Sequence, residues 1–134
     1  MKRSNTIFPL QSRSFRGQRW VNILLRTAHL VGIAGVAGGA LFQLPIELWL
    51  NYLYITVLSG CTMVIIEIWT NGIWLIQLRG LATLLKLAIL SLALSADLQA
   101  YMIFSAIILS GIFSHAPGKV RYYSIFHGKV IEQL

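Results

Sequence analysis

The chain has 134 residues, of which 57% are hydrophobic and only 11% are charged, and its mean hydropathy is +0.72. A soluble domain of this size needs about a quarter of its residues charged to cover its core, so the composition practically excludes a soluble globular protein. The net charge is +7, but eight of the eleven Lys and Arg residues lie before the first or after the last apolar segment. That distribution is typical of residues that flank membrane segments and contact anionic head groups, and no recognition motif indicates nucleic-acid binding.

Residues 1–19 form a basic tail that is rich in Ser and Arg and contains no acidic residue. The apolar stretch that follows is too long for a secretory signal, and no small-residue cleavage site comes after it. We therefore expect a cytoplasmic tail that contacts anionic lipid head groups. A mitochondrial presequence has the same composition and is the alternative.

Four apolar segments follow, and each is predicted to be a membrane-spanning helix: about 20–42, 48–69, 73–94 and 98–114. At 1.5 Å per residue the first three reach roughly 33 Å and the fourth roughly 25 Å, against a hydrocarbon core of about 30 Å. The breaks between them contain turn formers and are short, so neighbouring helices run antiparallel. The expected fold class is an all-α integral membrane protein with a four-helix antiparallel bundle over residues 20–114.

The third segment has an alternative boundary. If residues 69–78 lie flat at the inner interface, the helix begins near Gly80 and has only about 15 residues, which is short for a span. Asn71 and Gly72 form a strong turn signal. We therefore expect one long helix from Ile73.

The topology follows from the positions of Lys and Arg, which are absent from the connections around Pro45 and Asp97. These connections are predicted to face outward and both termini to face the cytoplasm, in the cell inner membrane or, alternatively, the mitochondrial inner membrane. Residues 115–134 form a basic and aromatic cytoplasmic tail. The tail either lies along the interface with its aromatic side chains toward lipid, or returns beneath the bundle, where Arg121 and His127 can cap the polar residues of the spans.

Polar residues inside the spans are the candidate functional residues, because an ionisable group in a membrane costs a few kcal/mol or more unless it is paired, hydrated or able to reach the surface. The expected intramembrane polar cluster, from the inner side to about mid-membrane, is Arg26, His29, Ser59, Glu67, Arg79 and Lys86. Glu67 is the only acidic residue at that depth and is expected to pair with an arginine. Lys86 has no evident acidic partner, so it is predicted to be neutral, hydrated, or paired with a ligand or another subunit. The two arginines can also reach the inner surface along their aliphatic stems.

The first predicted helix carries a set of glycines that includes a GxxxG pair: Gly32, Gly35, Gly38 and Gly39. Small residues let a second backbone approach closely. This helix is therefore expected at the centre of the bundle, or as the docking surface for a second copy or a partner membrane protein.

His29 and His115 are candidate ligands for a metal or a b-type haem, since neutral imidazole is a usual axial ligand. Residues 26–32, Arg-Thr-Ala-His-Leu-Val-Gly, followed by Gly38 and Gly39, resemble the first helix of small membrane cytochromes and copper-resistance membrane proteins. The resemblance covers one of the four predicted helices. His29 lies about nine residues deep, whereas His115 lies at the membrane edge, so sharing one iron requires a shift of depth.

No catalytic triad, phosphate-binding loop or HExxH motif is present, so an enzyme that acts alone is not expected. The leading prediction is an accessory or structural subunit of a membrane complex, either as a homo-oligomer or with a partner membrane protein. One alternative is a small oligomeric transporter or ion pathway. It would use the polar residues that lie along one face of each of the first three predicted helices, the polar stripes. The other is an electron-transfer protein that binds a b-type haem through His29.

Overall fold

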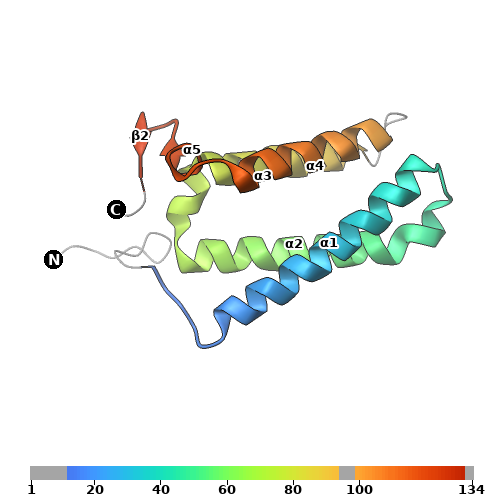
Figure 1. Ribbon diagram of the computed structural model, residues 1–134, viewed down its shortest axis with the longest axis horizontal. Helices are drawn as coiled ribbons and strands as arrows, with labels where there is room; N and C mark the ends of the chain where they lie inside the picture. Colours follow the sequence, from blue (N-terminus) through green and yellow to red (C-terminus); the bar gives the residue numbers. More distant parts are fainter. Residues whose placement is uncertain (1–11, 94–98, 132–134) are drawn as a thin grey trace. The chain divides into compact units, whose positions relative to one another are not determined.

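The computed structural model describes residues 12–93 and 99–131, which are mostly helical (Figure 1). The elements in chain order are α1 (Gln18–Leu41), α2 (Ile46–Thr70), the 3-10 helix η1 (Gly72–Ile76), α3 (Leu78–Ala93), α4 (Gln99–His115), α5 (Gly118–Arg121), β1 (Tyr123–Ser124) and β2 (Lys129–Val130). The predicted segments 20–42, 48–69 and 98–114 agree with α1, α2 and α4 to within two residues. The turn predicted at Asp97 and residues 1–11 of the N-terminal tail lie outside the described residues.

Two of the described helices, α1 and α2, are long and apolar enough to cross a membrane. Helices α3 and α4 have 16 and 17 residues, at or below the lower end of the usual length for a span. The chain divides into two compact units. The first unit, Ser14–Ile66, contains α1 and most of α2, and the second contains the end of α2 from Glu67, the elements that follow, and the residues up to Arg13.

In the first unit, α1 and α2 are joined by a tight connection. Leu44 donates its backbone N–H to the carbonyl of Gly39 across 2.9 Å, and Gln43 between them has a left-handed backbone with φ of 51°. The indole Nε1 of Trp49 donates to the Leu44 carbonyl across 3.1 Å, which fixes the start of α2 to the connection. Pro45 precedes the first residue of α2, as the turn chemistry of this stretch predicts.

The prediction of one continuous third helix from Ile73 is wrong. The side chain of Asn71 accepts a hydrogen bond from the Ile73 backbone N–H and begins η1, and Gln77 is extended with ψ of 154°, so α3 starts only at Leu78. The alternative prediction, in which the third helix begins near Gly80, is closer to the structure. Gly80 lets the break form, because a Cβ there would collide with the carbonyl of Trp74.

The rest of the second unit is a helical pair followed by a small hairpin. Helices α3 and α4 pack against each other, and Ile103 and Ala106 of α4 are buried. Strands β1 and β2 pair antiparallel, with Tyr123 opposite Val130. Nothing in the sequence pattern predicted this hairpin.

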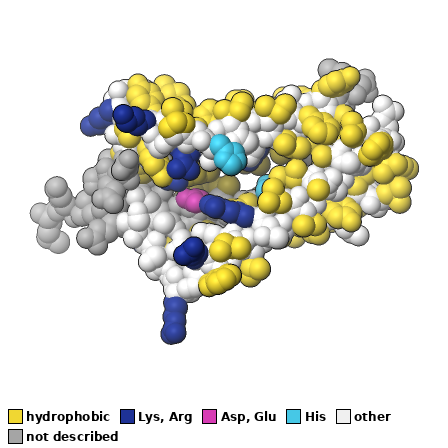
Figure 2. Space-filling view, in the orientation of Figure 1, with side chains coloured by type: hydrophobic (Ala, Val, Ile, Leu, Met, Phe, Trp, Pro, Cys, Tyr) yellow, Lys and Arg dark blue, Asp and Glu magenta, His cyan; other side chains and the backbone are white. Residues whose placement is uncertain are grey.

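Large hydrophobic side chains cover much of the surface of both units. On the face shown in Figure 2, hydrophobic side chains cover much of the surface. Two examples, Leu58 of α2 and Ile108 of α4, are 67% and 62% exposed. Exposed apolar surface of this extent marks contacts with a membrane or with another protein.

Candidate functional site

His29 connects α1 to α2 within the first unit. Its Nδ1 lies 2.9 Å from the backbone carbonyl of Thr56 and 3.1 Å from the hydroxyl of Ser59. Since a carbonyl oxygen only accepts, Nδ1 carries the hydrogen, and in the neutral ring the lone pair is on Nε2. A Cβ at Gly60 would lie 3.0 Å from Cε1 of the ring, so this glycine makes room for the imidazole. Of the predicted polar cluster, His29 and Ser59 are thus in contact.

Three of the four predicted packing glycines face α2 of the same chain. An added Cβ would collide with Thr56 at Gly32, with the Tyr52 ring at Gly35 and with the Trp49 ring at Gly39. At Gly38 an added Cβ meets nothing within 4 Å. Docking of a second copy on this helix stays a prediction.

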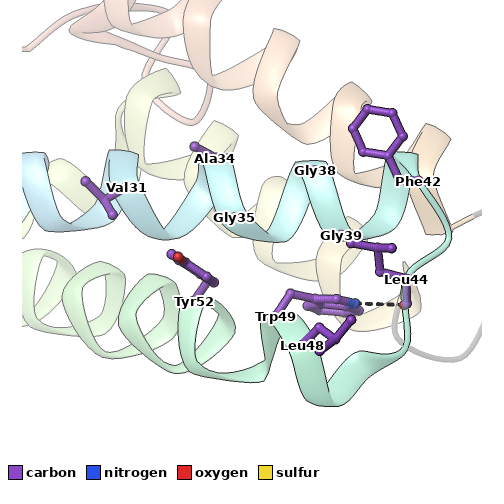
Figure 3. Close-up of a pocket in the computed structure, with 10 residues that line it drawn as sticks. All are labelled: Val31, Ala34, Gly35, Gly38, Gly39, Phe42, Leu44, Leu48, Trp49 and Tyr52. Carbon is purple, nitrogen blue, oxygen red and sulfur yellow. Dashed lines mark hydrogen bonds between the residues drawn. The ribbon is translucent and has the colours of Figure 1, made fainter.

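An apolar groove lies beside these glycine contacts, as Figure 3 shows. It is lined by Val31, Ala34, Gly35, Gly38, Gly39, Phe42, Leu44, Leu48, Trp49 and Tyr52. No charged side chain lines it, and the one indole N–H is already bonded to the Leu44 carbonyl. The groove is therefore mainly apolar, with the hydroxyl of Tyr52 as a further polar group among its lining residues.

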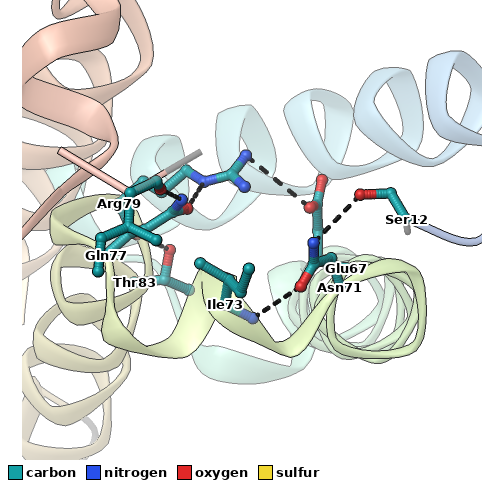
Figure 4. Close-up of polar contacts among 8 residues, drawn as sticks. Ser12, Glu67, Asn71, Ile73, Gln77, Arg79 and Thr83 are labelled. Carbon is teal, nitrogen blue, oxygen red and sulfur yellow. Dashed lines mark hydrogen bonds and ion pairs between the residues drawn. The ribbon is translucent and has the colours of Figure 1, made fainter. Parts of the chain in front are cut away.

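Glu67 and Arg79 meet in the second unit, where α2 ends and α3 begins (Figure 4). Nη1 of Arg79 lies 4.0 Å from Oε2 of Glu67, and Nε of Arg79 donates to Oε1 of Gln77 across 2.6 Å. The amide of Gln77 in turn donates to the Ile131 carbonyl across 2.5 Å, although these residues are 54 positions apart. Gln77 is only 1% exposed. Its amide therefore joins the start of α3 to the end of the C-terminal hairpin.

The C-terminal segment adds a second guanidinium beside Arg79. The guanidinium carbons of Arg79 and Arg121 lie 5.1 and 5.4 Å from the centroid of the Tyr122 ring. Nε of Arg121 is buried and has no hydrogen-bond partner among the described residues. The Arg79–Tyr122 contact and the Gln77–Ile131 hydrogen bond thus bring the C-terminal segment to the start of α3, whereas His127 bonds to Ser124 within its own hairpin. Capping of the polar residues of the spans by Arg121 stays a prediction.

Lys86 belongs to α3, and its side chain reaches α4. Its Nζ donates to the hydroxyl of Ser110 across 3.3 Å, and no carboxylate lies within ion-pair distance in the described part of the chain. Arg26 is exposed on α1 and has no hydrogen bond or ion pair among the described residues. His115 is exposed at the C-terminal end of α4, in the second unit, whereas His29 belongs to the first.

Most Ser and Thr hydroxyl groups within the helices donate a hydrogen bond to a backbone carbonyl of the same helix. Each donates to a carbonyl one turn earlier: Thr27, Thr56, Ser59, Thr62, Thr83, Ser91, Ser105 and Ser114. Such bonds satisfy a hydroxyl in an apolar environment without a ligand. For these groups the contacts favour a structural role.

The sequence patterns missed Gln77 and Tyr122 as members of a polar site. The sequence pattern predicts Gln77 as one position of a continuous helix and Tyr122 as an aromatic residue of the C-terminal tail at the membrane interface. A glutamine placed between two apolar runs, after an Asn-Gly turn, is the one local signal that could have marked it.

Among residues 12–93 and 99–131 no group of three or more His, Cys, Asp or Glu side chains is placed to hold a metal ion. The chain matches no protein-family model, no curated protein and no solved structure.

Proposed function

We propose that the chain is a multi-pass inner-membrane protein with α1–α4 in the bilayer and both termini in the cytoplasm, and that it is an accessory subunit of a membrane complex. The length and hydropathy of α1 and α2 and the exposed apolar side chains support the membrane placement. The absence of Lys and Arg around Pro45 and Asp97 supports the orientation.

The position of Lys86 within α3 is the observation that best supports a role as an accessory subunit. It is the ninth of the 16 residues of α3, so it lies roughly 12 Å from the start of that helix. An ammonium at such depth costs about 2.5–3.5 kcal/mol unless it is compensated, and a neutral hydroxyl such as that of Ser110 does not cancel its charge. A carboxylate from a neighbouring protein would do so.

A second copy of the chain is a poor source of that carboxylate. The four acidic residues are Glu47, Glu67, Asp97 and Glu132, and each lies at or near the end of an apolar segment or in the C-terminal tail. None is at the depth of Lys86. We therefore expect a different membrane protein, with an acidic residue at mid-membrane, as the partner.

The test is purification of the tagged full-length chain from its own host membrane in a mild detergent, with the stoichiometry of any partner measured. A stoichiometric partner is expected, and Lys86→Met is expected to lose at least nine-tenths of it. Lys86→Arg, which keeps the charge, should keep most of it. Lys129→Met is the matched control, because it removes an exposed charge from the hairpin.

A partner that binds wild type and Lys86→Met equally would contradict the role given to Lys86. Recovery of no stoichiometric partner from any of these proteins would contradict the accessory function itself. As a further check, neutralising the partner's mid-membrane carboxylate should release the wild-type chain to the same extent as Lys86→Met.

A further inference from the structure

In the second unit, two guanidinium groups lie near one tyrosine ring, and the described residues of this unit carry too little negative charge to balance them. Arg79 and Arg121 each lie within 5.4 Å of the Tyr122 ring centroid, close enough to repel each other. Among residues 12–93 and 99–131, the carboxylate beside them is that of Glu67, which is 4.0 Å from Arg79 and so farther away than in a good charged hydrogen bond. The pair therefore keeps an excess positive charge.

Nε of Arg121 is a second feature that favours an anionic ligand. It is buried and makes no hydrogen bond to any described residue, although a buried N–H donor without an acceptor is costly. The described part of this unit contains one acidic residue, Glu67, against six basic ones: Arg13, Arg79, Lys86, Lys119, Arg121 and Lys129. We propose that Arg79 and Arg121 bind the phosphate of an anionic phospholipid head group, with the Tyr122 ring in contact with both guanidinium groups.

The position along the chain favours a lipid phosphate over a partner's side chain. Glu67 lies three residues before the end of α2, so in the proposed topology it and Arg79 lie roughly 5 Å from the inner membrane boundary. Head-group phosphates lie at that boundary, and aromatic residues such as Trp69 and Tyr123 are typical of it. Planar guanidinium groups bind phosphate oxygens through paired N–H donors. This inference rests on the membrane placement proposed above.

The test compares the thermal unfolding of the full-length chain in nanodiscs of phosphatidylcholine alone and of phosphatidylcholine with phosphatidylglycerol. Phosphatidylglycerol should raise the unfolding midpoint of the wild type by about 4 °C or more. Arg121→Gln should lose that rise, yet unfold no earlier than wild type in phosphatidylcholine alone, because it removes a buried unpaired donor and a repulsion. A merely structural arginine would instead lower the midpoint in both lipids.

Lys119→Gln is the matched control, since it removes the same charge from an exposed position of α5 and should keep the rise. Arg121→Lys keeps the charge and should keep part of the rise, which preserves the test if Arg121→Gln does not fold. If Lys119→Gln and Arg121→Gln lose the rise in unfolding midpoint to the same extent, the proposed site is wrong and diffuse surface charge explains the effect.

Two further outcomes would overturn the lipid as ligand. In one, inorganic phosphate added to phosphatidylcholine nanodiscs reproduces the full rise. In the other, phosphatidylglycerol has no effect and Arg121→Gln loses a copurifying protein. Flotation of the chain with vesicles tests the membrane placement separately: a chain that floats but does not respond to phosphatidylglycerol contradicts only the lipid site.

Discussion

Gln77 connects three parts of the second unit through one buried side-chain amide. It ends η1, accepts from Arg79 and donates to the Ile131 carbonyl, so it joins two helical elements and the C-terminal hairpin. Buried polar groups are costly unless their hydrogen bonds are made, and here both ends of the amide are bonded.

Gln77→Ala is expected to lower the free energy of unfolding by about 1–3 kcal/mol, because it leaves the Arg79 Nε and the Ile131 carbonyl without their partner. The measurement is SDS-induced or thermal unfolding in detergent, followed by circular dichroism. Asn51→Ala, at an exposed position of α2, is the control and should change little. Equal stability of the two variants would show that this hydrogen-bonded junction does not form in the protein.

His29→Ala should destabilise the α1–α2 pair by about 1–2 kcal/mol, because the Thr56 carbonyl and Ser59 lose their contact with the ring. His115→Ala, at an exposed position, should have no effect under the same unfolding conditions. The absorbance spectrum of the dithionite-reduced protein is recorded in parallel. A Soret band that His29→Ala removes would give His29 the haem role instead of this packing role.

At the scale of the element, the glycines of α1 allow two alanine substitutions in the same helix to be compared. Gly35→Ala should cost about 1–3 kcal/mol, since its methyl group would collide with the Tyr52 ring. Gly38→Ala meets open space and should be neutral or stabilising by up to about 1 kcal/mol, because alanine favours a helix over glycine. Both changes are measured by SDS titration of the purified protein. The opposite order would mean that Gly38, and not Gly35, faces the neighbouring helix.

At the scale of the whole molecule, the proposed topology makes a prediction about reporter fusions. Alkaline phosphatase, which is active only outside the cytoplasm, should be active after Asp97 and inactive after Leu134, and green fluorescent protein should give the reverse pattern. An inactive phosphatase at Asp97 would show that the short helices α3 and α4 do not cross the bilayer. An active one after Leu134 would contradict the cytoplasmic C-terminus.

The boundaries of α1, α2 and α4 were determined by the sequence alone, because a helix in an apolar segment depends on local hydropathy and ends where turn formers such as Pro45 stand. The apolar composition likewise predicted helices that are long and apolar enough to cross a membrane, as α1 and α2 are. These properties depend on neighbouring residues only, so no knowledge of distant contacts is needed to predict them.

Only the tertiary structure decided the contacts of Gln77, which arginine pairs with Glu67, and the face that each glycine presents. Gln77 and Ile131 are 54 residues apart, and Arg79 meets Tyr122 across a similar separation, so no local pattern encodes these contacts. Gly35 and Gly38 look alike in the sequence, yet only one of them meets an aromatic ring. The physical reason is that buried polar groups and close-packed faces take their partners from distant segments, whereas apolar helices form wherever the local sequence is suitable.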